Sequence, residues 1–172
     1  MPHSQNRILS KVSAVDLADL QPHLRIVELQ REQVLADSRT FVHNVYFPHS
    51  GILSSIVEMK DGIGIESGMI GWDGVFGAAQ ALDHKLSLNK VMVQVPGRAT
   101  VADANVIRDV AESSPDFRAL LIRAEQFFLA QVQQTSACNA LHTVEQRMCK
   151  WLLRMYDLVG EELPLTQEFL LK

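Results

Sequence analysis

Hydrophobic and polar residues alternate with a period of two in several short segments of the first hundred residues. In residues 63–70 the odd-numbered positions form the more apolar face, and in residues 91–95 three valines share one face. This alternation is typical of half-buried strands. It predicts strands at residues 43–47, 51–59, 63–70, 88–95 and 97–101, preceded by a strand at 24–29, with residues 33–35 and 37–39 as the link between them.

Turn-forming residues separate these segments. Asp61 and Gly62 lie between two predicted strands, and this pair tolerates the positive φ of a tight hairpin. Pro48–Gly51 and Pro96–Gly97 mark two further turns. Short strands joined by tight turns predict an antiparallel jelly roll, a roll of strands that can hold one small molecule. With the helices that follow, the fold class is α+β.

After residue 101 the period changes to that of helices. Asp103 is the predicted N-cap of a short helix that reaches Glu112. Ser114, followed by Pro115 and Asp116, is the predicted N-cap of a long helix. Similar spacings predict one or two short helices in residues 7–20 and another at 137–159, which ends at a glycine.

Four residues of the long helix recur at spacings of four, three and four, which is the spacing of a coiled-coil seam: Phe117, Leu121, Ala124 and Phe128. Two interpretations stay open. The helix covers the roll and does nothing else, or it is shared between the roll and a second subunit and these residues form a homodimer interface.

Composition narrows the class of protein. The chain has 172 residues, of which 47% are hydrophobic, so it can bury a core as one domain or slightly more, and it is not disordered. A net charge of −4 argues against a surface that binds polyanions throughout, and a solvated face explains the mildly basic residues 117–154. No apolar run approaches the roughly 18 residues of a membrane span, so we expect a soluble, cytoplasmic protein without membrane partners.

Candidate metal and redox chemistry is sparse. Cys138 and Cys149 favour a reducing compartment and two core thiols over a disulfide framework, and an iron–sulfur cluster would need four thiolates. The six histidines contain no His-x-His pair of the kind found in metal-binding cupins, so no metal site is predicted. A haem, which needs one histidine and one further axial ligand, stays open.

Catalytic chemistry is not indicated either. Three carboxylates, Asp61, Glu66 and Asp73, lie near predicted turns, where solvation explains them. Neither a nucleophile with its base nor a phosphate-binding glycine loop is present. Trp72 and Phe76 either line a pocket or pack in the core, and core packing is the commoner role of aromatic residues. We therefore expect a protein that is not an enzyme.

The order of these elements resembles the Crp/Fnr family of bacterial transcription regulators. The segments that carry the resemblance are VYFPHSGI at 45–52, GMIGWDGVFG at 68–77, CNALHTVEQR at 138–147 and LTQE at 165–168. The resemblance extends over the chain from about Arg7.

The resemblance implies a jelly-roll sensor of the cyclic-nucleotide-binding type in residues 1–113 and a dimerisation helix in 114–136. Residues 137–172 would begin a winged helix-turn-helix that binds DNA, with Thr166 and Gln167 at its start. A helix-turn-helix needs roughly twenty residues. The recognition helix is therefore absent from these 172 residues, which favours a C-terminally truncated regulator.

The resemblance also implies where a ligand would lie, namely in a pocket built from Gly74, Val75, Phe76, Gly77, Ser87, Asn89 and Lys90. In family members that bind cyclic nucleotides, a glutamate accepts a hydrogen bond from the ribose and an arginine holds the phosphate. Here Val75 stands at the glutamate's position, and Lys90 lacks the guanidinium's two-pronged geometry. We expect no tight binding of cyclic AMP and predict no cofactor.

Two functions from different classes follow. In the first, the chain is a transcription regulator that senses an unknown signal and, as a full-length dimer, binds DNA. In the second, it is a stand-alone sensor or dimerisation module that acts on a protein partner. Whether the native chain continues past residue 172 separates them, and a small-molecule effector is compatible with both.

Overall fold

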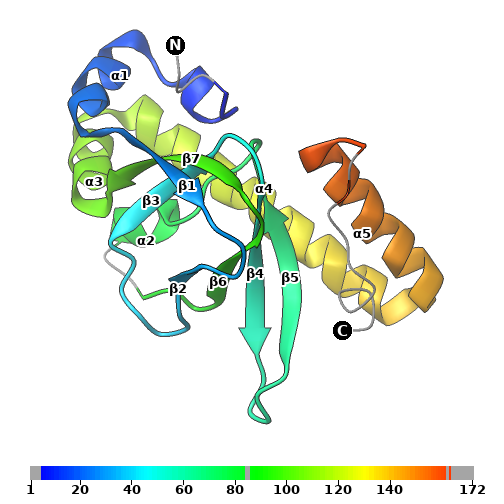
Figure 1. The fold of residues 1–172 in the computed structure, drawn as a ribbon. Coiled ribbons are helices and arrows are strands. Elements are labelled where there is room, and N and C mark those ends of the chain that lie inside the picture. Colours follow the sequence, from blue (N-terminus) through cyan, green and yellow to red (C-terminus); the bar gives the residue numbers. More distant parts are fainter. Residues whose placement is uncertain (1–4, 84–85, 162, 164–172) are drawn as a thin grey trace.

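Two antiparallel sheets form the centre of the protein (Figure 1). The computed structural model describes residues 5–83, 86–161 and 163. A three-stranded sheet has the order β1-β7-β3 and a four-stranded sheet the order β2-β6-β4-β5. The predicted strands are confirmed as β1 Arg25–Leu29, β3 Asn44–Pro48, β4 Ile52–Glu58, β5 Gly64–Ile70, β6 Lys90–Val95 and β7 Gly97–Asp103. The short strand β2 Val34–Ala36 lies in the segment that the sequence predicted as a link.

The hairpin between β4 and β5 turns where the sequence predicts. Gly62 has a φ of 84°, and its N–H donates to the Met59 carbonyl oxygen at 2.9 Å. The α+β class and the jelly-roll arrangement are thus confirmed.

The helices surround these sheets: η1 Leu9–Lys11, α1 Ala14–Leu20, η2 Gln21–His23, α2 Ala78–Asp83, α3 Ala104–Ser113, α4 Pro115–Leu141 and α5 Val144–Val159. Both predicted caps are present, since Asp103 accepts from the Asn105 N–H and Ser114 from the Phe117 N–H. The sequence did not predict α2, because it is short and its alanines form no wide apolar stripe. No helix among the described residues is long and apolar enough to cross a membrane.

The boundary between the last two helices differs from the prediction. Helix α4 does not end at residue 136 but continues unbroken to Leu141, and the break lies at His142 and Thr143. Thr143 accepts a hydrogen bond from the Gln146 N–H, and Gln146 Oε1 accepts one from the Thr143 N–H at 3.0 Å. This reciprocal capping box starts α5 and explains why the helix breaks here.

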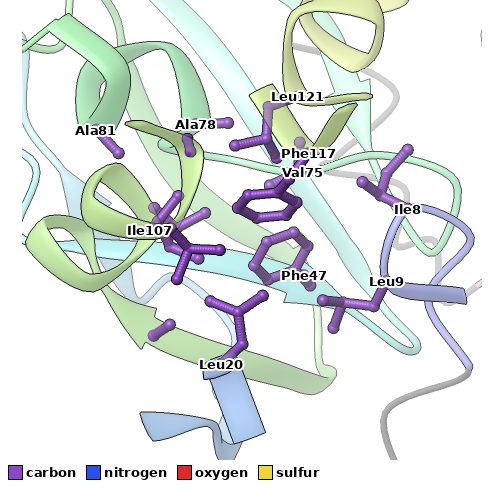
Figure 2. Packing of buried hydrophobic residues seen from close by; sticks show 14 of the residues in the cluster. Ile8, Leu9, Leu20, Phe47, Val75, Ala78, Ala81, Ile107, Phe117 and Leu121 are labelled. Atoms are coloured by element: carbon purple, nitrogen blue, oxygen red, sulfur yellow. The ribbon is translucent and has the colours of Figure 1, made fainter. Parts of the chain in front are cut away.

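Three buried clusters separate the layers. One fills the space between the two sheets, with Leu53, Val93 and Val101 at its centre. A second lies between the three-stranded sheet and helices α1, α3 and α4, where Phe47 and Phe117 lie beside each other (Figure 2). The third lies under α5, on the outer face of the four-stranded sheet. Helix α5 therefore packs on the sheet rather than projecting from it.

The predicted dimer seam of α4 is used within the chain. Phe117 and Leu121 are almost fully buried, and Figure 2 shows both side chains directed into the core beside Val75. Ala124 is buried in the same cluster, and Phe128 packs half-buried against the cluster between the sheets. Phe117, Leu121 and Ala124 therefore face the roll, which does not fit the predicted contact with a second subunit, whereas for the half-buried Phe128 that contact stays a prediction.

The two cysteines differ in environment. Cys138 on α4 is buried, as predicted, but Cys149 on α5 is exposed, so the prediction of two core thiols is wrong for Cys149. The reason is the break between α4 and α5, which turns Cys149 away from the sheet that covers the other side of α5.

Candidate functional site

The first half of the predicted ligand pocket is part of the core. Val75 is 5% exposed and belongs to the cluster beneath α4. Phe76 stacks on Tyr46 with ring centroids 6.0 Å apart, and the two residues exchange backbone hydrogen bonds of 2.8 and 2.9 Å. Phe76 thus takes the core-packing role that its residue type favours, and Val75 offers no polar group to a ligand.

The second half of that pocket is engaged in its own hydrogen bonds. Ser87 Oγ donates to the Asn89 carbonyl oxygen at 2.6 Å, and Asn89 Nδ2 donates to Ser55 Oγ at 3.1 Å. Lys90 Nζ lies 3.4 Å from a carboxylate oxygen of Glu58. These groups hold the loop before β6 in place, so a ligand would have to displace those contacts.

The two halves of that pocket are not joined by polar contacts between described residues. Within the described residues, no hydrogen bond or ion pair joins the 74–77 segment to Ser87, Asn89 or Lys90. Two cavities of about 570 and 530 Å³ are lined by other residues, one beside α4 and the N-terminal segment, the other at the α4–α5 break. No group of three or more His, Cys, Asp or Glu side chains in the described ranges could hold a metal ion.

The groups that do converge lie where α5 packs on the four-stranded sheet, which we call the α5 docking surface. Its apolar part contains Met155 and Leu158 of α5 against Ile52 and Met69 of the sheet. The contact is close at Gly71, where an added Cβ would lie 2.6 Å from a Leu158 methyl carbon. A side chain at this position would force α5 away from the sheet.

Glu66 is the central polar residue of the α5 docking surface. One carboxylate oxygen accepts from Ser54 Oγ at 2.5 Å and from Gln94 Nε2 at 2.9 Å, and the other accepts from Trp151 Nε1 at 2.8 Å. Burial raises the pKa of the Glu66 carboxyl, and the hydrogen bonds from Ser54, Trp151 and Gln94 oppose that rise. The prediction that solvation explains Glu66 is therefore wrong.

Asp73 forms the second polar attachment of α5. Arg154 Nη1 and Nη2 donate to its two carboxylate oxygens at 2.8 and 3.0 Å, a two-pronged pair in which the Asp73 side chain is only 9% exposed. Trp72 Nε1 donates to the Asp157 carbonyl oxygen at 3.2 Å. Solvation thus accounts for neither Asp73 nor Glu66, whereas Asp61 in the hairpin turn is exposed as predicted.

The loop that carries Asp73 is also held from the N-terminal side. Asn6 is fully buried, and its Nδ2 donates to the carbonyl oxygens of Pro48 and Gly74 at 2.8 and 2.9 Å. The Arg7 N–H donates to the Trp72 carbonyl oxygen at 2.8 Å. The 72–74 loop is therefore fixed between the N-terminal segment and α5, so a displacement of this loop would reach both.

Sequence reasoning missed this site because its partners are distant in the chain. Trp151 and Glu66 are 85 positions apart, and Arg154 and Asp73 are 81 apart. One indication was available in the sequence, namely Glu66 inside the predicted strand at 63–70. If another element covers the face of the sheet that carries a glutamate, the buried charge needs a hydrogen-bonding partner. The predicted DNA-binding residues Thr166 and Gln167 lie outside the described residues.

Comparison with known proteins places the fold. No protein-family model and no curated protein sequence matches the chain. One similar solved structure is that of a transcriptional regulator from Eubacterium rectale assigned to the Crp/Fnr family. The match covers 97% of this chain and 79% of the regulator's chain, with a TM-score of 0.78 and 10% sequence identity. The c-di-GMP-responsive global regulator CLP from Xanthomonas campestris matches over 88% and 76%, with a TM-score of 0.69 and 11% identity.

A third similar structure is the regulatory domain of Toxoplasma gondii PKA in complex with cAMP. The match covers 63% of this chain and 41% of the Toxoplasma chain, with a TM-score of 0.55 and 15% sequence identity. The present chain therefore spans less than half of that protein's length. At these identities the likeness concerns the fold. The chain therefore has a cyclic-nucleotide-binding-type roll followed by a long helix, arranged as in Crp/Fnr regulators.

Proposed function

We propose that this chain is the sensor part of a cytoplasmic Crp/Fnr-type transcription regulator without catalytic activity, which acts as a homodimer and binds DNA through a segment that follows α5. The fold supports this proposal. The observation that carries it is the α5 docking surface, where the helix that would lead into the DNA-binding segment is attached to the sensor sheet at Glu66 and Asp73.

The proposed mechanism uses this attachment as the two-state element. A signal that moves β5 or the 72–74 loop would change the hydrogen bond from Trp151 and the ion pair of Arg154, and so the orientation of α5. A DNA-binding segment connected to α5 would be reoriented with it. A ligand alters this equilibrium only by binding one of the two arrangements more tightly.

The dimer interface that we propose is the exposed face of α4. Ile122 and Leu129 lie seven positions apart and are 40% and 54% exposed. Together with three further exposed residues, they form a row whose members are alternately three and four positions apart: Ala119, Ile122, Gln126, Leu129 and Gln133. This is the spacing of a coiled-coil seam, and polar residues within such a seam specify its register.

The experiment that tests the function begins with the intact mass of the protein isolated from its source cells. A mass several kilodaltons above 19.2 kDa supports a DNA-binding extension. That protein should then enrich a palindromic site from random duplex DNA, with an affinity that falls steeply with salt. A native mass of 19.2 kDa without DNA enrichment would contradict the proposal and favour the stand-alone sensor or dimerisation module.

A further inference from the structure

The two cysteines of the chain face the same cleft at the α4–α5 break. This cleft, of about 530 Å³, is lined by Gln134, Cys138, His142, Glu145, Gln146, Cys149, Lys150 and Leu153. Cys138 belongs to the last turns of α4 and Cys149 to the second turn of α5. The α5 docking surface uses the opposite side of α5, through Trp151, Met155 and Leu158. The cysteine cleft is therefore separate from it.

The break in the helix is what brings the two sulfurs to one cleft. In a continuous helix, residues eleven positions apart would lie about 16 Å apart along the axis. Here His142 and Thr143 have extended backbones, with ψ of 151° and 165°, and α5 folds back beside α4. Lys150 Nζ donates to Thr135 Oγ1 at 2.9 Å, so the turn of α5 that carries Cys149 faces the turn of α4 that precedes Cys138.

The two thiols differ in a way that suits a stepwise oxidation. Cys149 is exposed and can meet a soluble oxidant, whereas Cys138 is buried. Cys138 Sγ accepts a hydrogen bond from Gln134 Nε2 at 3.3 Å, which holds the sulfur at the wall of the cleft. An accessible thiol beside a second, protected thiol is the arrangement of a reactive and a resolving cysteine.

We propose that Cys149 and Cys138 form a reversible intrachain disulfide in response to hydrogen peroxide, and that this bond locks the α4–α5 break. The Cys149 thiolate attacks one peroxide oxygen, so that an S–O bond forms and the O–O bond breaks, and hydroxide leaves as water after taking a proton. The Cys138 thiolate then attacks the Cys149 sulfur, so that the S–S bond forms and the S–O bond breaks, releasing a second water.

The disulfide has a mechanical consequence. Disulfide geometry requires Cα atoms about 4.4 to 6.8 Å apart, so the bond would hold α4 and α5 at that separation across the cleft. The two helices meet at His142 and Thr143, and a covalent link across this two-residue connection removes the freedom of α5 to pivot there. The proposal does not depend on DNA binding, because the thiols and the break are both within the described residues.

The test treats the chain with one equivalent of hydrogen peroxide and maps its peptides without reduction. We expect both free thiols to disappear, peptides containing residues 138 and 149 to be linked within one chain, and dithiothreitol to restore them. Hydrogen exchange of the amides at residues 142–146 should slow at least about tenfold in the oxidised chain. Unchanged exchange would overturn the locking of the break.

Matched variants distinguish the two roles. Cys138→Ser should leave Cys149 as a sulfenic acid that dimedone traps, whereas Cys149→Ser should show no sulfenic acid and no loss of its remaining thiol. Two results would overturn the disulfide: a crosslink between two chains through Cys149, or oxidation of wild-type Cys149 to sulfinic acid while the Cys138 thiol persists.

Discussion

Among single residues, Glu66 combines a buried position with three hydrogen-bond donors from two strands and one helix. A carboxylate is the side chain best able to accept all three at once, since it has two acceptor oxygens and no donor. Its charge is costly to bury, and this cost makes the α5 docking surface sensitive to pH.

The pH dependence has a definite sign. Because burial raises the pKa of Glu66, the folded state binds this proton more tightly than the unfolded state. The resulting stabilisation is present at low pH and is lost as the pH rises through the raised pKa. We expect the free energy of unfolding of wild type, relative to Glu66→Gln, to fall as the pH rises above 4.5, the ordinary pKa of a glutamate, and through the raised pKa of Glu66.

Urea unfolding followed by tryptophan fluorescence measures this difference. Glu112→Gln, at the exposed end of α3, is the control, and its difference from wild type should not follow the same course. If the difference between wild type and Glu66→Gln is the same at each pH, the burial of a titrating carboxyl at Glu66 is contradicted.

Gly77 and Gly62 separate two effects of a glycine. Both have positive φ, 92° and 84°, but only at Gly77 would an added Cβ meet other atoms, with the Asn44 carbonyl oxygen 2.8 Å away. We expect Gly62→Ala to cost about 1 kcal/mol, from the left-handed backbone alone, and Gly77→Ala roughly 2 kcal/mol more. Equal losses in chemical denaturation would show that the loop before α2 relaxes around the new methyl group.

At the scale of elements, α4 has two faces with different partners. One face, with Phe117 and Leu121, packs on the roll, and the other exposes Ile122 and Leu129. A helix that is apolar on two sides suits a position between a core and a second subunit. Periodicity alone cannot assign the two faces, because both have coiled-coil spacing.

Substitutions on the two faces of α4 should therefore have different effects. We expect wild type at high micromolar concentration to scatter light as a dimer, and Ile122→Glu with Leu129→Glu to scatter as a folded monomer of 19.2 kDa. Leu121→Ala should instead cost about 2 to 5 kcal/mol of stability while the seam stays intact. A wild-type protein that remains monomeric would rule out the proposed seam.

The attachment of α5 can be measured in the same way. Hydrogen exchange of the α5 amides gives the free energy of opening this helix in wild type, Asp73→Asn, Arg154→Met and the double variant. We expect the effects of the two substitutions on this free energy to be non-additive, with a coupling energy of about 1 kcal/mol or more. The control pair is Arg98 and Glu28, 3.8 Å apart with both side chains mostly exposed, where we expect negligible coupling. Equal coupling in both pairs would mean that Asp73 does not hold α5.

At the scale of the whole molecule, the layers leave little room for a nucleotide between the sheets. The cluster between them includes Phe76, Val91 and Val93, all buried. The polar residues of the predicted pocket are already engaged, Ser87 with Asn89, Asn89 with Ser55 and Lys90 with Glu58. A ligand there would have to displace packed side chains, which costs free energy before any contact forms.

We therefore predict that cyclic AMP does not bind tightly. Titration calorimetry with the whole chain should show no saturable heat at micromolar concentrations. Saturable micromolar binding would contradict this prediction. A variant with Lys90→Ala would then show whether the loop before β6 provides the phosphate contact.

What the sequence determined by itself is local. The strands and the hairpin follow from two-residue alternation and an Asp-Gly turn, and the starts of α3 and α4 follow from Asp103 and Ser114. These features depend on residues within one or two turns of each other, so the local pattern was sufficient to predict them.

Tertiary structure decided which faces meet. Phe117 became core rather than interface, Glu66 and Asp73 acquired partners more than eighty positions away, and Cys149 turned toward the cleft that Cys138 lines. The physical reason is the same in each case. A periodic pattern specifies that a face is apolar or charged, but the free energy of burying it depends on which distant element covers it.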